Sequence, residues 1–202
     1  MREQDFEIIE KKTPYQGYFR VVKYQLKHRL FQGGWTPVHS REVFERPSAV
    51  AVLPYDPVLN RVLLIEQFRP GPLGSSYDPW LIEIVAGCYD EGDDLKETAK
   101  RESFEEAGCK IEALYLLYDY FVSPGGSNEL LHVYIGKTDA SKIKGIHGLE
   151  DENEDIRVLN LSLDEALALM HANKIKTSPA ILSLQWLEYN RDQLLKLWQN
   201  EK

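Results

Sequence analysis

The chain has 202 residues, a formal net charge of −8 and a hydrophobic content of 43%, values typical of a globular protein with a core of its own. An acidic chain lacks the basic surface that binds nucleic acid or anionic membranes, so we expect neither partner. No apolar run reaches the roughly 18 residues of a transmembrane helix, and the first twelve residues lack the apolar core of a signal peptide. Two cysteines are too few for a disulfide scaffold and fit a reducing cytoplasm.

The first 47 residues are predicted to be β structure. Residues 6–12, 18–28 and 38–46 are rich in β-branched and aromatic residues, with glycines between them. Three strands are too few to bury an independent core. We therefore expect residues 1–47 to form a small antiparallel β appendage that packs on the main domain, on a partner chain, or on both.

Residues 48–202 carry the pattern of a larger domain. A hairpin is predicted from two apolar strands at residues 48–55 and 61–68. Further strands are predicted at residues 81–87, 113–122, 130–136 and 156–161, and helices are expected after Asp94, from Ser162 and from Ser178 to about residue 199. A polar connection fills residues 137–154. Strands with helices interspersed late in the chain predict an α/β (α+β) fold with a mixed sheet covered by helices.

The most informative stretch runs from Gly87 to Cys109 and contains one predicted helix. Asp94 is a favoured N-cap, and Glu97 stands where it would complete a capping box. Gly108 is well placed to end the helix in a left-handed conformation. The spacing therefore predicts a helix between Asp94 and Gly108.

Three glutamates lie on or beside the face of this helix that should point to the core. At about 100° per residue, Leu95, Ala99, Glu102 and Glu106 fall on one stripe, with Glu105 at its edge. Carboxylates this close repel each other, and a hard divalent cation such as Mg²⁺ or Mn²⁺ would neutralise them. A solvated acidic helix end is the alternative, although it opposes the helix dipole. The spacing alone favours neither reading.

The same stretch resembles the signature of the Nudix hydrolase family, G-x5-E-x7-R-E-U-x-E-E-x-G-U, where U is aliphatic. The required residues are present at Gly87, Arg101, Glu102, Glu105, Glu106 and Gly108. Asp93 replaces a glutamate of the signature, and Ser103 and Cys109 replace aliphatic residues. The resemblance implies that residues 48–202 form the α/β/α sandwich of this family. It also implies that the β appendage packs across a homodimer and completes the partner's substrate site.

The chemistry implied by the resemblance is Mg²⁺-dependent hydrolysis of a nucleoside diphosphate linked to another group, with Mn²⁺ as a substitute. Divalent ions neutralise and orient a diphosphate that would otherwise repel the attacking water. Carried over by position, the metal ligands would be Glu102, Glu105, Glu106 and the backbone carbonyl of Ala86. Arg101 would orient the carboxylates by pairing with Glu97 or Glu105.

A general base is expected in the segment HGLEDENEDIRV. This segment resembles the loop that folds over the site in the ADP-ribose pyrophosphatases of the family. The resemblance implies that Glu152 is the base and that Glu154 is an auxiliary metal ligand, acting beside the catalytic ligand Glu106. The alternative is a solvated acidic loop. His147, in the same segment, is expected to be structural.

Two features bear on the phosphate end of the substrate. Pro124 stands fifteen residues past Cys109, and a proline at about this distance is typical of ADP-ribose pyrophosphatases, although a Pro-Gly pair alone indicates only a turn. Arg69 resembles the arginine that meets the phosphates in these enzymes.

Three residues of the β appendage are candidates for substrate binding in a partner's site. Arg41 would hold phosphate, Glu45 would hold adenine, and Phe19 would stack on adenine. Plain packing of Phe19 and a surface ion pair of Arg41 are the alternatives.

The sequence thus predicts a cytoplasmic, homodimeric pyrophosphatase that converts ADP-ribose to AMP and ribose 5-phosphate. Hydrolysis of another nucleotide sugar such as GDP-mannose is the first alternative. A non-catalytic nucleotide sensor and a purely structural Mg²⁺ or Ca²⁺ site are the others.

Overall fold

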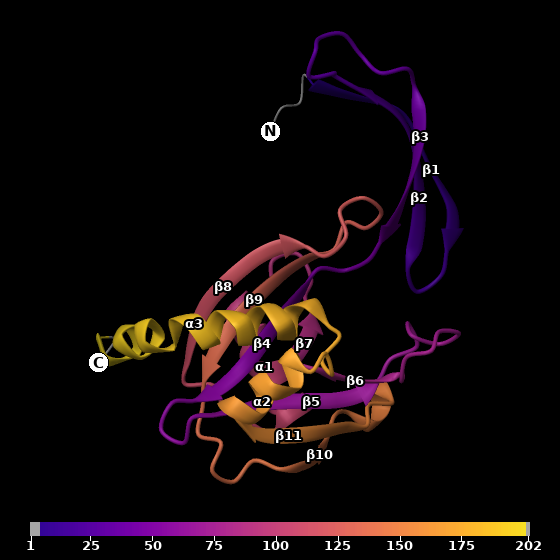
Figure 1. Ribbon diagram of the computed structural model, residues 1–202. Helices are drawn as coiled ribbons and strands as arrows, with labels where there is room; N and C mark the ends of the chain where they lie inside the picture. Colours follow the sequence, from indigo (N-terminus) through magenta and orange to yellow (C-terminus); the bar gives the residue numbers. More distant parts are fainter. Residues whose placement is uncertain (1–4, 201–202) are drawn as a thin grey trace. The chain divides into compact units, whose positions relative to one another are not determined.

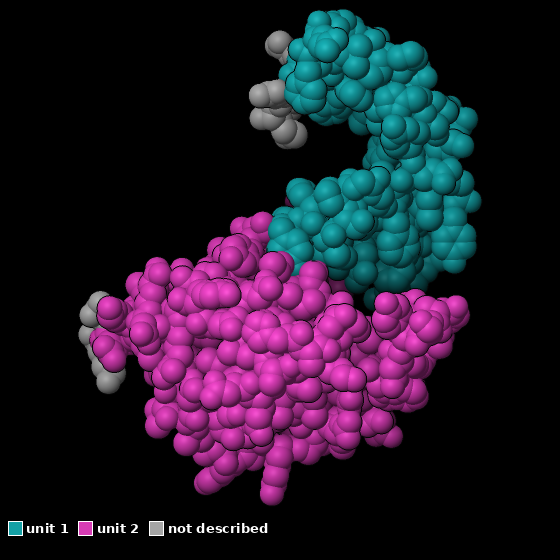
Figure 2. All heavy atoms as spheres, viewed as in Figure 1, with its two compact units in different colours: residues 1–48, 120–131 teal, residues 49–119, 132–202 magenta. Residues whose placement is uncertain are grey.

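The computed structural model describes residues 5–200. The chain divides into two compact units, one of residues 1–48 and 120–131 and the other of residues 49–119 and 132–202 (Figure 2). We call them the small unit and the large unit. The division of the chain into functional domains at residue 47 stays a prediction.

The small unit contains an antiparallel sheet of β1 (Phe6–Gln16), β2 (Arg20–His28) and β3 (His39–Glu45), in that order. Every residue of β1 is exposed, so this strand buries little of its apolar surface within the chain. Its register shifts twice along β1, which marks bulges. The predicted antiparallel β appendage is confirmed.

A mixed sheet forms the middle layer of the large unit. Its strands are β4 (Ala49–Asp56), β5 (Arg61–Phe68), β6 (Trp80–Glu83), β7 (Val85–Cys88), β8 (Ala113–Phe121), β9 (Leu130–Lys137), β10 (Gly145–His147) and β11 (Ile156–Ser162). Among the described residues the order is β10-β11-β5-β4-β9-β8, with β6 paired to β5 and β7 to β4 (Figure 1). The predicted hairpin of β4 and β5 is confirmed.

Helices cover both faces of this sheet because its central strands are apolar on both sides. The helices are α1 (Leu95–Ala107), α2 (Leu163–His171) and α3 (Ser178–Asn200). Val50 and Val52 of β4 pack with Ala99 of α1 in one core cluster, whereas Tyr55 stacks on Trp198 of α3. Alternate residues of a strand point to opposite faces, so α1 and α3 lie on opposite sides of β4. The predicted α/β/α sandwich is confirmed. No helix in residues 5–200 is long and apolar enough to cross a membrane.

The strand predicted at residues 81–87 is in fact two strands that meet at Ile84. The first, β6, pairs with β5 (Ile65 opposite Glu83), and the second, β7, pairs with β4 (Val52 opposite Val85). The chain therefore changes partner at Ile84, and β7 lies against α1. This step brings the backbone of Ala86 to the glutamate face of the helix.

Candidate metal centre and active site

Both ends of α1 are fixed by local hydrogen bonds. The Asp94 carboxylate accepts from the backbone N–H of Glu97 at 3.3 Å, and Gly108 ends the helix with a φ of 62° and an N–H bond to the Phe104 carbonyl of 2.9 Å. The predicted cap and stop are confirmed. The predicted capping box is wrong, because the Glu97 carboxylate pairs with Lys100 at 2.7 Å instead.

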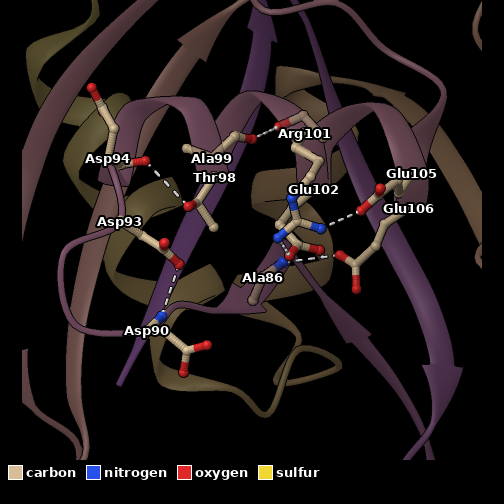
Figure 3. Close-up of polar contacts among 11 residues, drawn as sticks. Ala86, Asp90, Asp93, Asp94, Thr98, Ala99, Arg101, Glu102, Glu105 and Glu106 are labelled. Carbon is tan, nitrogen blue, oxygen red and sulfur yellow. Dashed lines mark hydrogen bonds and ion pairs between the residues drawn. The ribbon is translucent and has the colours of Figure 1, made fainter. Parts of the chain in front are cut away.

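The stripe of α1 faces the core as predicted. Ala99 is fully buried, and Glu106 is only 2% exposed although it carries a carboxyl group. The Glu106 carboxylate accepts from the Ala86 N–H at 2.9 Å, as Figure 3 shows. Beside it, a Cβ on Gly87 would lie 2.0 Å from the carboxyl carbon of Glu102, so only glycine leaves room for that side chain.

Arg101 lies between two carboxylates of the helix. Its guanidinium donates to Glu105 and to Glu102, each at 2.6 Å (Figure 3). The predicted pairing with Glu105 is correct, and that with Glu97 is wrong. In the part of the chain that the structure describes, no three His, Cys, Asp or Glu side chains lie as close as metal ligands do. Arg101 instead binds an oxygen of Glu102 and one of Glu105, and a divalent cation would have to compete with it for them.

Burial dominates the electrostatics of Glu106. It raises the pKa of this carboxyl group to about 8, against the opposing effect of the Ala86 N–H bond. The negative charges of Glu154 and Glu102 raise this pKa further, and the positive charge of Arg69 lowers it. Two other carboxylates and a cation therefore lie close enough to Glu106 to act on its charge.

Glu102 has the same character in a weaker form. Burial raises its pKa, the Arg101 guanidinium opposes that rise, and the charges of Glu105 and Glu154 add to it. Buried carboxylates that raise each other's pKa are stabilised by a nearby cation. Their oxygens are also the ligands that Mg²⁺ and Mn²⁺ prefer. The donor set therefore fits a hard divalent metal ion.

The acidic loop contributes Glu154 to this group but not Glu152. Glu154 is half-buried, and its carboxylate accepts from the Leu149 N–H at 3.1 Å. Glu152 ends the 3₁₀ helix η2 (Glu150–Glu152) and is exposed. Among residues 5–200, no hydrogen bond or ion pair joins its carboxylate to another group. Its role as base stays a prediction.

Arg69 follows β5 and is held by a carboxylate that the sequence did not single out. Its Nε donates to Glu83 of β6 at 3.0 Å, and the Gln67 amide donates to the same oxygen at 3.3 Å. Arg69 thus lies in the large unit, and its positive charge lowers the pKa of Glu106. The sequence did not indicate a role for Glu83, because its contacts with Gln67 and Arg69 depend on the pairing of β5 with β6.

Glu45 and Phe19 make contacts within the small unit. The Glu45 carboxylate binds Arg20 at 2.5 Å and Lys11 at 3.4 Å, and these bonds lower its pKa although burial acts to raise it. The Phe19 ring lies edge-on to Phe44, with centroids 5.1 Å apart. In a single chain, then, Glu45 is engaged in ion pairs and Phe19 in packing.

Arg41 and Pro124 are the other two substrate candidates of the small unit. Arg41 is exposed and donates to the Ser40 carbonyl at 2.9 Å. Pro124 lies in the turn between β8 and β9, which is closed by a bond of 3.1 Å from the Gly126 N–H to the Ser123 carbonyl. All four candidates belong to the small unit and the carboxylates to the large unit, so a common substrate site stays a prediction.

Comparison with known proteins identifies relatives of this chain. The model of the NUDIX domain matches residues 45–181. The ADP-ribose pyrophosphatase of Escherichia coli (strain K12) is 41% identical over 194 residues, which cover 96% of this chain and 93% of that protein. The GDP-mannose pyrophosphatase of Cronobacter sakazakii is 34% identical over 186 residues, covering 90% of this chain and 94% of that protein.

A crystal structure described as that of an ADP compounds hydrolase shares the fold, with a TM-score of 0.67 and 21% identity over 93% of this chain and 96% of that one. The domain match spans the helix with its three glutamates, the loop that carries Glu154 and every strand of the large-unit sheet. With that coverage, the chain belongs to the NUDIX domain family.

Proposed function

We propose that the protein is a divalent-metal-dependent pyrophosphatase that hydrolyses ADP-ribose to AMP and ribose 5-phosphate. The observation that carries the chemistry is the Glu106 carboxylate, which is only 2% exposed and accepts from the Ala86 N–H. The negative charges of Glu102 and Glu154 act on the pKa of this buried group. The choice of substrate is supported by the 41% identity to an ADP-ribose pyrophosphatase over nearly the whole chain.

Mg²⁺ is the proposed ion, with Mn²⁺ as a substitute. Glu102, Glu105 and Glu106 would hold it with the Ala86 carbonyl, and Glu154 would assist from the loop. A bound Mg²⁺ supplies positive charge that offsets the charge of the diphosphate and of the leaving group. Arg101 would orient the carboxylates of Glu102 and Glu105 before the ion binds, and would then release the bonded oxygens to the ion.

The remaining residues act on the substrate and on the attacking water. Arg69, fixed by Glu83, would meet the diphosphate with its guanidinium. Glu152 would take the proton of the attacking water, which fits an exposed carboxylate on a short helix with no side-chain partner among residues 5–200. Cleavage of the diphosphate then leaves AMP and ribose 5-phosphate.

We further propose that two chains share each site. Phe19, Arg41, Glu45 and the turn at Pro124 would bind the adenosine and phosphate in a homodimer. The exposed apolar residues of β1 support this, because a single chain leaves Phe6 45% exposed and Ile8 and Ile9 50% exposed. A cytoplasmic location is proposed from composition alone, since two cysteines in 202 residues fit a reducing compartment.

GDP-mannose is the second candidate substrate, supported by the 34% identity to a GDP-mannose pyrophosphatase. Chromatography of the products separates the two. The protein is incubated with Mg²⁺ and ADP-ribose, GDP-mannose, UDP-glucose, a diadenosine polyphosphate or ATP, with and without chelator. AMP formed fastest from ADP-ribose, and lost with chelator, is the expected result. Faster release of GMP from GDP-mannose would reassign the substrate, and no product from any compound would overturn the proposal.

The matched control in this assay is a second glutamate of the same helix. Glu97→Gln removes a carboxylate of α1 that is 69% exposed and, within the described residues, has Lys100 as its one side-chain partner. The rate of Glu97→Gln should stay within twofold of wild type, because an exposed ion pair of this kind contributes little and Glu97 is not a proposed metal ligand. Glu106→Gln removes the buried carboxylate of the same helix, and its kcat should fall at least about a hundredfold.

A further inference from the structure

The acidic loop is joined to the C-terminal end of α1 by a backbone hydrogen bond. The carbonyl of Glu105 is one of the last in the helix and has no partner within it, because the N–H of Cys109 bonds to Ser103 instead, at 3.2 Å. The N–H of Gly148 donates to that carbonyl at 3.0 Å. The loop therefore satisfies a helix end that would otherwise lack a partner.

A second contact beside this bond comes from the ring of His147. A Cβ on Gly108 would lie 2.3 Å from the His147 Cε1 atom and 2.9 Å from its Nδ1 atom. The imidazole thus covers the glycine that ends α1, with no room for a larger residue. Its Nε2 atom lies 3.2 Å from the carbonyl oxygen of Lys144, and the residue pairs with Ile156 of β11. The ring is consequently within hydrogen-bond distance of the segment just before β10, while it packs on the end of α1.

The same loop continues directly to Glu154. The Glu154 N–H donates to the Leu149 carbonyl at 3.1 Å, and the Leu149 N–H donates to the Glu154 carboxylate at 3.1 Å. Gly148 has a φ of 103°, and a Cβ there would lie 2.6 Å from the Cβ of Glu154. These contacts leave few ways to move Glu154 without moving Gly148 and His147 as well.

We propose that His147 is a positioning residue that docks the loop of residues 148–155 on the end of α1 and so sets where Glu154 stands relative to Glu102 and Glu106. Its effect on turnover rests on the proposed function. Its effect on the order of the loop does not. The first step is therefore a measurement without substrate.

Hydrogen exchange of the metal-free, full-length protein provides that measurement. In His147→Ala, peptides covering residues 145–155 should exchange about tenfold faster or more, while peptides of α2 and α3 keep their wild-type rates. His171→Ala removes an exposed histidine of α2 that pairs with Glu188 and should leave residues 145–155 unchanged. His147→Phe keeps a ring over Gly108 and should restore the protection of the loop. Unchanged exchange of residues 145–155 in His147→Ala, or an equal increase over the whole chain, would overturn the proposal.

Turnover of ADP-ribose tests the link to Glu154. His147→Ala should lower kcat about tenfold and change KM less than twofold, with most of the rate restored in His147→Phe. If His147 acts through Glu154, the double variant with Glu154→Gln should be no more than about twofold slower than Glu154→Gln alone. Rate losses that multiply would overturn the positioning role. If the wild-type protein did not hydrolyse ADP-ribose, the proposed function would fail while the exchange result would still decide the docking.

Discussion

Replacing Glu106 with glutamine should stabilise the metal-free protein while abolishing its activity. Burial raises the pKa of this carboxyl group from its ordinary 4.5 to about 8, so the folded state binds a proton that the unfolded chain releases. When folding raises the pKa of a carboxyl group, the free energy of unfolding falls. This loss is small below the pKa of the unfolded state and grows until the pH exceeds the pKa of the folded state. For Glu106 the loss of free energy of unfolding amounts to about 5 kcal/mol above pH 8, about 3 kcal/mol at pH 7 and less than about 1 kcal/mol at pH 5.

Glutamine removes the titrating group and keeps the shape. Its amide oxygen can still accept from the Ala86 N–H, which now bonds the carboxylate at 2.9 Å. Thermal unfolding of wild type and Glu106→Gln is measured with chelator at pH 5, 7 and 8.5, with Glu97→Gln as the control. Glu106→Gln should unfold several degrees above wild type at pH 8.5 and close to it at pH 5. Addition of Mg²⁺ should stabilise wild type and not the variant.

Equal melting temperatures of wild type and Glu106→Gln at pH 8.5 without metal would show that the buried charge of Glu106 does not destabilise the fold. They would mean that water or a rearranged side chain relieves the charge of Glu106. A stabilisation by Glu106→Gln that appeared at pH 5 and vanished at pH 8.5 would contradict the prediction as well, because the expected stabilisation grows as the pH rises.

Three further variants test other contacts. Gly87→Ala places a Cβ 2.0 Å from the carboxyl carbon of Glu102 and should weaken Mg²⁺ activation at least about tenfold; unchanged activation by Mg²⁺ would show that Glu102 is not a ligand. Arg69→Ala should raise KM for ADP-ribose at least about tenfold with a smaller effect on kcat, and an unchanged KM would remove Arg69 from the phosphate site. Coexpression of Glu106→Gln with Arg41→Ala should give about a quarter of wild-type activity, because mixed dimers keep one intact shared site; no gain over either variant alone would contradict sharing.

The parts of the fold that the sequence predicted depend on neighbours in the chain. Asp94 and Gly108 act on backbone groups within four residues, so the limits of α1 follow from local rules. The inward stripe of glutamates follows from helix periodicity alone. The predicted capping box is absent for a local reason as well, because Glu97 pairs with Lys100, which lies about one turn further along α1.

The parts that the sequence did not predict depend on contacts between distant segments. The division of one predicted strand at Ile84 follows from which strands are free to pair with it. The contacts of His147 with Gly108 and of Gly148 with Glu105 join residues about forty positions apart, and periodicity carries no signal for them. Glu45 likewise binds Arg20 and Lys11 through the antiparallel sheet of the small unit.

Anomalous diffraction from crystals grown with Mn²⁺ and a non-hydrolysable ADP-ribose analogue would show whether Glu102 and Glu106 hold the divalent ion of a pyrophosphatase. We expect anomalous peaks within about 2.3 Å of carboxylate oxygens of Glu102 and Glu106, beside the diphosphate. Peaks elsewhere on the protein, with Arg101 still bonded to Glu102 and Glu105, would contradict this expectation.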